Sequence, residues 1–476
     1  MNSFADYTMT IGGQAWPTQR QLEVVNPATG MPFAAAPAAS AADLDAAVSA
    51  ARAAWGPWKA LPLETRRGFL VAAANALKAQ VDDFTRLFTM EQGRTLEAAR
   101  QEVLYSASWM KGAARLELPV EVVEETPQRR VELHYEPLGP VCAIVPWNFP
   151  LMLAIWKIAP ALLAGNTMVM KPSPFTPLLS LKLGELWREI LPPGVFNVIT
   201  GGDELGPLMT AHPGFAKISF TGSTATGKRV LHAASDRLTS VTLELGGNDV
   251  AIVLPDIDLD AVVPQLFHGA FYNSAQVCIA TKRMYIHDSI YDAVRDRLHA
   301  MIRQTVVGDG LQPGVHYGPV QNAPLYQRLL GMMEEARGLG LKLLSGQTPP
   351  RGEGYFVPLT LIDNPPDDAR VVTEEAFGPL LPLMRFSNVD DVIRRANDSR
   401  YGLAGAVWSR NVEQAVAIAK RLETGTVWIN QNLQSAPHIP FAGQKESGMG
   451  VENGVEGLKS FTQLKTLFIP KAAAAA

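Results

Sequence analysis

The cysteine at position 278 is the first candidate for covalent chemistry in this chain of 476 residues. It stands in Asn273-Ser-Ala-Gln-Val-Cys-Ile-Ala-Thr, between a segment that predicts an apolar helix and one that predicts a strand. A thiolate in a loop that faces a cleft is a strong nucleophile, although a lone cysteine is more often a small buried hydrophobe. Cys142 lies within an apolar run and is expected to be buried. Two cysteines cannot form a disulfide framework, and their scarcity fits a reducing compartment.

Two further polar side chains follow segments that predict buried strands. Glu244 ends Val241-Thr-Leu-Glu and precedes Gly246 and Gly247. A buried carboxylate is costly unless it is paired or used, and the glycines would let the chain pass close to a ligand. Asn148 stands in Pro-Trp-Asn-Phe-Pro, where its amide could stabilise an oxyanion, a contribution of about 3 kcal/mol. A surface turn for the glutamate and a helix cap for the asparagine fit these patterns equally well.

Phosphate-binding features occur at two other predicted strand ends. Phe220-Thr-Gly-Ser is followed by Gly227 at the start of a predicted helix. Glycine permits close approach of a pyrophosphate, and a helix N-terminus favours an anion. This is not the complete Gly-x-Gly-x-x-Gly signature, so it is weak alone. Lys171-Pro-Ser ends another predicted strand, from which a lysine can reach ribose hydroxyls.

The elements that would position these residues have the pattern of an α/β protein. Residues from about 40 to 115 predict helices, and Ser40-Ala-Ala-Asp43 resembles a capping box. Continuous apolar strands, each followed by a helix, predict a doubly wound parallel sheet from Gly139, and a second α/β block follows Gly247. The segments 121–135 and 459–469 predict a projecting hairpin and a strand that pair with another subunit, because isolated hairpins are marginal in water.

Composition and motif searches exclude several other classes. The chain has 42 Lys+Arg against 46 Asp+Glu, which gives no electrostatic footprint for nucleic acid or an anionic membrane. Its eight histidines have no paired metal-ligand spacing, and no Cys-x-x-Cys or Gly-x-Ser-x-Gly occurs. We therefore expect no metal. Because no signal peptide or apolar run of about 20 residues is evident, a cytoplasmic location is expected.

Taken together, these motifs resemble the aldehyde dehydrogenase superfamily over nearly the whole chain. The resemblance is carried by the ordered set Pro146-Trp-Asn-Phe-Pro, Lys171-Pro-Ser, Phe220-Thr-Gly-Ser, Glu244-Leu-Gly-Gly, Gln276-Val-Cys and Glu374-Glu-Ala-Phe-Gly-Pro, with Asn26-Pro-Ala-Thr-Gly and Lys445-Glu-Ser-Gly near the two ends. It implies a Rossmann-like dinucleotide-binding domain (1–115 and 136–246), a second α/β catalytic domain (247–445) and a small β oligomerisation extension (116–135 and 446–476).

The resemblance also implies a mechanism. Cys278 as a thiolate attacks an aldehyde, and Asn148 with the Cys278 N–H holds the oxyanion of the thiohemiacetal. Hydride passes to a nicotinamide, and Glu244 activates the water that hydrolyses the thioester. The implied cofactor contacts are Trp147, Lys171, Ser173, Gly222, Ser223, Glu375 and Phe377. A small-molecule aldehyde is the expected partner, and a homodimer or homotetramer the expected assembly.

Two departures from the family pattern bear on these expectations. Members committed to NAD often have Glu where this chain has Pro174, so NAD is expected while NADP stays possible. Ala275 replaces the usual Gly of Gly-Gln-x-Cys, and its methyl should be tolerable if the backbone angle there is ordinary.

The implied substrate tunnel is apolar. It comprises Phe149, Leu153, Trp156, Val277, Ile279 and Phe441, with Ser435 and His438 near its mouth. Because it contains no Arg, an aliphatic or aromatic aldehyde is expected rather than an anionic semialdehyde. The alternatives are a coenzyme A-acylating relative, a cysteine acyl hydrolase or transferase without a redox step, and a non-catalytic homologue.

Overall fold

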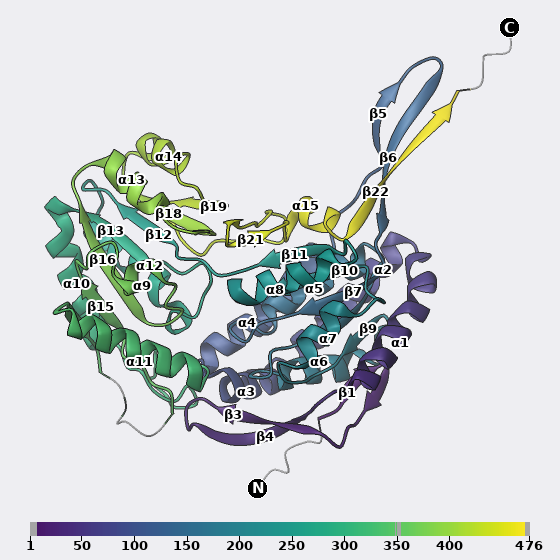
Figure 1. Cartoon of the computed structure of the whole chain (residues 1–476), viewed down its shortest axis with the longest axis horizontal. Coiled ribbons are helices and arrows are strands. Elements are labelled where there is room, and N and C mark those ends of the chain that lie inside the picture. Colours follow the sequence, from purple (N-terminus) through teal and green to yellow (C-terminus); the bar gives the residue numbers. More distant parts are fainter. Residues whose placement is uncertain (1–6, 348, 350–353, 472–476) are drawn as a thin grey trace.

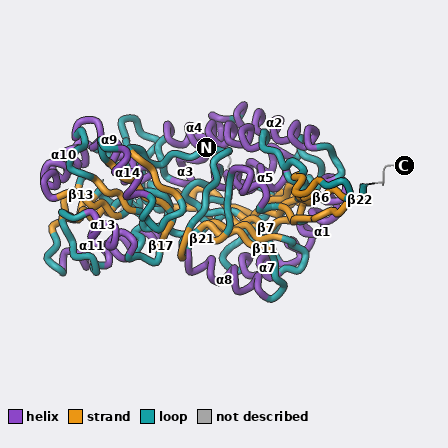
Figure 2. The backbone as a smooth tube through the Cα atoms, turned by 90° about the horizontal axis from the view of Figure 1, so that it is seen from above, coloured by secondary structure: helices purple, strands orange, loops and turns teal. Residues whose placement is uncertain are grey.

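The computed structural model describes residues 7–347, 349 and 354–471, which form two α/β lobes and a projecting arm (Figure 1). Each lobe contains its own β-sheet, and helices lie on both faces of the sheets when the chain is viewed from above (Figure 2). No helix in the described ranges combines the length and the apolar character that crossing a membrane requires. The predicted fold class, a Rossmann-like lobe with a second α/β lobe and a small β-extension, is confirmed.

The first lobe is built on an eight-stranded sheet of order β2-β1-β9-β8-β7-β10-β11-β21. Its five central strands are parallel and almost wholly buried, which explains their continuous apolar runs. The strands are β1 (Met9–Ile11), β2 (Gln14–Trp16), β7 (Pro140–Ile144), β8 (Thr167–Lys171), β9 (Phe196–Val198), β10 (Lys217–Thr221), β11 (Ser240–Glu244) and β21 (Gly448–Met449).

The order of this sheet creates a topological switch point between β7 and β10. The chain runs from β7 outward through β8 and β9, then returns to β10 on the other side of β7. Ligands of doubly wound sheets bind outside the carboxyl ends of the strands at such a point. The strands are linked by α5 (Met152–Leu163), α6 (Leu178–Trp187), α7 (Leu205–Ala211) and α8 (Thr224–Ser235). The residues that follow β7 and β10 therefore meet in one crevice.

Four N-terminal helices complete the first lobe, as the sequence predicts. The first begins with the expected capping box, in which Ser40 and Asp43 bond each other's backbone N–H. The helices are α1 (Ala41–Lys59), α2 (Leu63–Ala79), α3 (Val81–Gln92) and α4 (Leu96–Ala113), and a hairpin of β3 (Gln21–Asn26) and β4 (Met31–Pro37) lies below them in Figure 1. Helix α4 packs on α5, which follows β7.

The second lobe is built on a seven-stranded sheet of order β14-β15-β16-β13-β12-β18-β19, in which only β14 is antiparallel to its neighbour. Its strands are β12 (Val250–Val253), β13 (Arg283–His287), β14 (Lys342–Ser345), β15 (Thr360–Asp363), β16 (Leu380–Phe386), β18 (Ala404–Trp408) and β19 (Thr426–Ile429). Its helices are α9 (Leu259–Phe271), α10 (Tyr291–Gln304), α11 (Ala323–Gly338), α12 (Arg370–Thr373), α13 (Val389–Asn397) and α14 (Val412–Ala419). A short pair, β17 (Tyr401–Gly402) with β20 (Gln444–Lys445), lies beside it.

The arm is a three-stranded sheet in which the predicted hairpin and the C-terminal strand pair with each other. Strand β6 (Arg129–Pro137) lies between β5 (Glu121–Glu125) and β22 (Thr462–Pro470) and extends away from both lobes (Figure 1). The expected domain boundary at residue 446 differs from the structure. Strand β21 joins the first sheet and α15 (Gly454–Lys459) packs on α5, so only β22 continues into the arm. Hydrogen bonding to β11 holds this stretch on the lobe.

Candidate active site

Cys278 lies in the turn between α9 and β13 and lines a cavity of about 370 Å³. Cys278 is partly exposed as a residue, whereas Cys142 is fully buried in β7, as expected. The cavity walls come from α4 and α5 of the first lobe and from the segments around Tyr272 and Ser435 of the second lobe. The thiol is therefore presented to a space between the lobes that a small molecule can enter.

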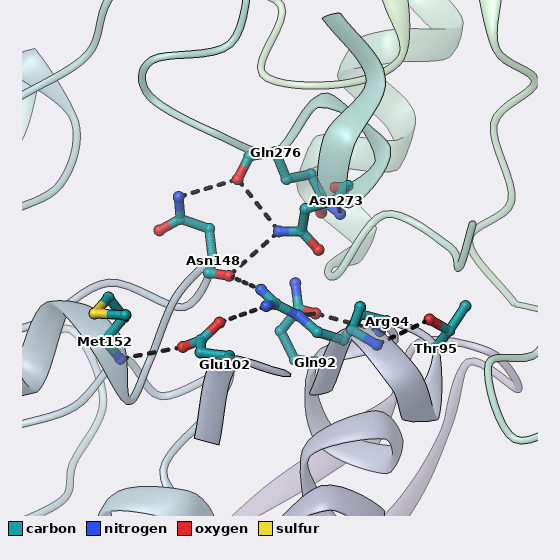
Figure 3. Close-up of polar contacts among 9 residues, drawn as sticks. Gln92, Arg94, Thr95, Glu102, Asn148, Met152, Asn273 and Gln276 are labelled. Atoms are coloured by element: carbon teal, nitrogen blue, oxygen red, sulfur yellow. Dashed lines mark hydrogen bonds and ion pairs between the residues drawn. The ribbon is translucent and has the colours of Figure 1, made fainter. Parts of the chain in front are cut away.

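Asn148 joins this turn from the end of β7. Its side-chain Nδ2 donates a hydrogen bond of 3.0 Å to the carbonyl of Gln276, two residues before the thiol (Figure 3). One amide hydrogen remains for another acceptor. Within the described residues, the N–H of Cys278 has no hydrogen-bond acceptor. The second amide hydrogen of Asn148 and the N–H of Cys278 are thus free in this turn, and a pair of N–H donors is what an oxyanion needs.

A buried ion pair holds the Asn148 segment from behind. Arg94 pairs with Glu102, and its Nη2 donates to the carbonyl of Asn148 at 2.5 Å (Figure 3). Its guanidinium also lies 4.6 Å from the ring centroid of Phe149, a cation–π distance. Glu102 accepts a 3.1 Å hydrogen bond from the N–H of Met152, at the start of α5. Both ends of the Asn148 turn are therefore fixed by one ion pair.

The turn that precedes the thiol is conformationally strained. Asn273, Ser274 and Ala275 have φ values of 53°, 54° and 60°, in the left-handed region. The methyl group of Ala275 was expected to be tolerable only if the backbone angle there is ordinary. The angle is not ordinary, so the methyl group adds strain where glycine would not. Strain of this kind persists only where surrounding contacts impose it. Here the side chain of Ser274 donates to the carbonyl of Gly318 at 2.8 Å.

Glu244 ends β11 as a buried carboxyl group. Both of its side-chain oxygens lack a hydrogen-bond partner within the described residues. Burial raises the pKa of Glu244 well above its usual value, nearby Glu452 raises it further, and Lys157 lowers it. Lys157 and Glu452 form a buried ion pair with an N–O distance of 2.5 Å. A carboxyl without a hydrogen-bond partner and with a raised pKa is, once ionised, a stronger base than an ordinary glutamate, which is the character of a candidate proton acceptor.

The thiol itself is held in its neutral form. Burial raises the pKa of Cys278 to about 12, and the charges of Asp249, Glu375 and Glu244 also raise it, while Lys282 lowers it. The site thus offers a thiol, unpaired N–H donors and a buried carboxyl, the groups that a nucleophile, an oxyanion pocket and a base would require.

The predicted cofactor residues of the first lobe gather at the switch point. Gly222 and Ser223 follow β10, and Ser223 is the N-cap of α8. A Cβ at Gly222 would come within 2.5 Å of the ring of Phe220, so a larger residue would require that ring to move. Lys171 and Ser173 are buried at the end of the neighbouring β8. A glycine turn, the N-terminus of a helix and a lysine together suit a dinucleotide phosphate and ribose.

Of the remaining cofactor candidates, Trp147 follows β7 of the first lobe, and Glu375 and Phe377 lie between α12 and β16 of the second lobe. Trp147 contacts Phe377 edge-on, with ring centroids 5.4 Å apart. Phe377 has a φ of 56°, which is rare for a bulky residue and marks strain. Glu375 accepts a 3.1 Å hydrogen bond from the N–H of Gly247. A Cβ on Gly246 would meet Glu375 Oε2 at 2.3 Å, so the glycine pair is needed for this approach.

Five of the six predicted tunnel residues line the cavity, namely Phe149, Leu153, Trp156, Val277 and Ile279, and so does Ser435. Phe441 does not; it packs edge-on against Trp156 with centroids 5.5 Å apart and supports the wall from behind. His438 is exposed and outside the lining.

Sequence reasoning missed the part of the wall that lies in other elements: Gln101, Glu102, Tyr105, Met152, His268, Tyr272, Leu433 and Gln434. The only local signal on α4 is an acidic residue, Glu102, on a face that otherwise carries apolar residues.

The whole chain is similar to known aldehyde dehydrogenases. The sequence model of the aldehyde dehydrogenase family matches residues 16–467. Phenylacetaldehyde dehydrogenase of Pseudomonas fluorescens is 38% identical, over 97% of this chain and 96% of that protein. An NADP-dependent enzyme of E. coli superposes with a TM-score of 0.94 at 34% identity, covering 98% of each chain. Betaine aldehyde dehydrogenase of Staphylococcus aureus, solved with NAD+, gives 0.91 at 32% identity, covering 97% of this chain and 95% of that one.

The agreement extends from the sequence motifs to both lobes and the arm. Aldehyde oxidation requires a nucleophile and a dinucleotide site. The cysteine in the cavity between the lobes and the switch point of the first sheet correspond to these two requirements. The chain therefore belongs to the aldehyde dehydrogenase family, and it oxidises an aldehyde to the carboxylic acid with NAD(P)+.

Proposed function

We propose that Cys278 is the nucleophile and that Asn148 and the Cys278 N–H bind the oxyanion. The thiolate sulfur bonds to the aldehyde carbon, and the carbonyl oxygen becomes the negative oxygen of a thiohemiacetal. The free amide hydrogen of Asn148 supports this role, because its other hydrogen already fixes the side chain to the carbonyl of Gln276 at 3.0 Å. A donor that is held in place before the reaction stabilises the developing charge without reorganisation.

We propose that Glu244 is the base of the second half-reaction. The bound nicotinamide supplies the hydride acceptor, so that the adduct on Cys278 becomes a thioester. Glu244 then takes a proton from water, whose oxygen attacks the thioester carbon and releases the acid and the thiol. The unpartnered oxygens of Glu244 support this role, since a carboxylate engaged in a salt bridge would be a weaker base.

We propose a neutral apolar aldehyde, aromatic or aliphatic, as the substrate. Within the described residues, the cavity has no Lys or Arg in its lining. Aromatic side chains of Tyr105, Phe149, Trp156 and Tyr272 contribute to it. Flat apolar walls favour an aromatic ring or a short alkyl chain over a carboxylate-bearing semialdehyde.

We propose that NAD is preferred to NADP. The carboxylates of Asp203 and Glu204 raise the pKa of Lys171 against the effect of burial, which lowers it to about 8. They therefore lie close enough to act on whatever Lys171 binds. Because Glu204 is paired with Arg20 at 3.2 Å, Asp203 is the acid of the two that would repel a 2′-phosphate on an adenine ribose held by Lys171 and lower its affinity. Pro174 offers no compensating donor.

We propose that the arm joins two copies of this chain in a homodimer or homotetramer. Large apolar side chains are exposed along it, including Val123, Leu464 and Phe468. A projecting edge of this kind is a template for pairing with another sheet. The prediction is a loss of assembly in Phe468→Asp, measured by light scattering.

We also propose a reducing, cytoplasmic location, which the free thiols at both cysteines support.

An aldehyde panel tests the function. Purified protein is mixed with benzaldehyde, phenylacetaldehyde, hexanal and succinic semialdehyde, each with NAD+ or NADP+, with and without coenzyme A. We expect reduced nicotinamide and free acid with the first three aldehydes and NAD+, independent of coenzyme A. A strict requirement for coenzyme A would indicate acyl transfer instead. Ester cleavage without any aldehyde oxidation would indicate a cysteine hydrolase and overturn the proposal.

A further inference from the structure

Lys282 is a buried cation four positions after Cys278. Its hydrogen bonds hold the backbone of the turn that carries the thiol. Its Nζ donates to the carbonyls of Val277 at 2.9 Å and Ala280 at 3.4 Å, and also to the carbonyl of Cys278 itself. The side chain is 5% exposed. A lysine that donates to three carbonyls of one turn fixes the backbone on both sides of the sulfur.

The same Nζ also faces a carboxylate. It lies 3.4 Å from Oε1 of Glu375, the oxygen that accepts from the N–H of Gly247. Asp249 is the other acid that acts on this pair, because its pKa is affected by both Lys282 and Glu375. The charge of Lys282 is thus shared among the thiol turn and two carboxylates.

We propose that Lys282 is a positioning residue that supplies the counter-charge for the Cys278 thiolate, and that the carboxylate of Glu375 partly neutralises this positive charge. The proposal rests on Cys278 being the nucleophile. Within the described residues, four charged groups act on the thiol, and Lys282 alone among them is cationic; Asp249, Glu375 and Glu244 are acidic. Removal of Lys282 leaves three acids around a thiol that must ionise, which disfavours the thiolate. Removal of the Glu375 charge leaves less negative charge to neutralise Lys282, which favours the thiolate.

The direction of each effect follows from charge. A cation near the sulfur favours the thiolate and lowers the pKa of Cys278, so the thiolate fraction at a given pH below that pKa is larger. One unit of pKa changes this fraction tenfold. Lys282→Met should therefore slow thiolate chemistry, and Glu375→Gln should accelerate it. Gln at 375 keeps the side-chain oxygen that accepts from Gly247.

Alkylation by iodoacetamide measures the thiolate without aldehyde or cofactor. The thiolate sulfur bonds to the methylene carbon and expels iodide. Cys142 is wholly buried, and the Cys278→Ala variant measures how much Cys142 is labelled as background. The rate above this background therefore reports on Cys278. The rate is followed by mass spectrometry from pH 6 to pH 10. Failure of the aldehyde panel would leave this readout intact, so the two proposals fail separately.

We expect Lys282→Met to lower the alkylation rate at pH 8 about tenfold. Lys420→Met, which removes an exposed lysine from the same lobe, should leave the rate unchanged. Glu375→Gln should raise the rate about threefold to tenfold, and this gain should vanish in the Lys282→Met background if Glu375 acts through Lys282. An unchanged pH profile in Lys282→Met, or slower alkylation in Glu375→Gln, would overturn the proposal.

Discussion

The side-chain amide of Asn148 and the main-chain carbonyl of Gln276 are joined by a 3.0 Å hydrogen bond across the two lobes. Asn148 follows β7 of the first sheet, and Gln276 belongs to the turn that carries Cys278 in the second lobe. This bond sets the proposed oxyanion donor relative to the proposed nucleophile. The geometry of the site therefore depends on how the lobes are packed.

Asn148→Ala removes the side-chain donor and should lower kcat about 100- to 1,000-fold, as the loss of one oxyanion donor does in other enzymes. The rate of Cys278 alkylation should stay near that of the unmodified protein, because alkylation forms no oxyanion. Stopped-flow measurement of nicotinamide reduction, together with iodoacetamide labelling, checks both. An equal loss in the two assays would assign Asn148 a structural role only.

Glu244→Gln should keep the first-turnover burst of reduced nicotinamide and slow the steady state about 100- to 10,000-fold, the usual contribution of a general base. Since the pKa of Glu244 is raised, its carboxyl is protonated at lower pH, and the steady-state rate should rise as pH increases through that pKa. Rapid-mixing traces across pH measure both effects. Equal loss of burst and steady state would place the base elsewhere, and Cys278→Ala should abolish both phases.

Glu102→Gln should destabilise the fold by about 3–5 kcal/mol, because it leaves the Arg94 cation buried without its partner. Both side chains are 2% exposed. Asp82→Asn is the matched control, since its exposed ion pair with Arg100 should contribute less than about 1 kcal/mol. Urea denaturation followed by tryptophan fluorescence gives both values. A loss no larger than the control's would mean that the buried pair adds no stability.

Ala275→Gly should stabilise the protein by roughly 0.5–1 kcal/mol, because relief of a left-handed alanine exceeds the added entropy of glycine. Ala280→Gly in the same turn is the control; Ala280 is fully buried and is not among the residues with positive φ, so it should destabilise by about 1 kcal/mol. Thermal unfolding of the two variants compares them. Destabilisation by Ala275→Gly would show that the methyl contact outweighs the backbone strain.

Much of the fold could be predicted because its signals are local. Buried parallel strands such as β7 and β8 appear as continuous apolar runs, and the Ser40–Asp43 box marks the start of α1. The sequence predicted that the 121–135 hairpin pairs with another subunit, and this pairing stays a prediction. Within the chain, the hairpin pairs with β22. A sequence shows that an edge needs a partner and does not show which one.

The sequence alone determined which chemical groups are available: a carboxyl, an amide and a glycine turn, each placed after a predicted strand, and a thiol placed between a predicted helix and a predicted strand. Only the tertiary structure decided their surroundings. The placement of Phe441 behind Trp156 and the approach of Lys282 to Glu375 join segments that are distant in the chain. The Arg94–Glu102 pair is local in sequence, but other elements bury it, and the left-handed angle at Ala275 depends on the contacts of its turn. Burial and charge act through space, so they exist only once the two lobes have packed together.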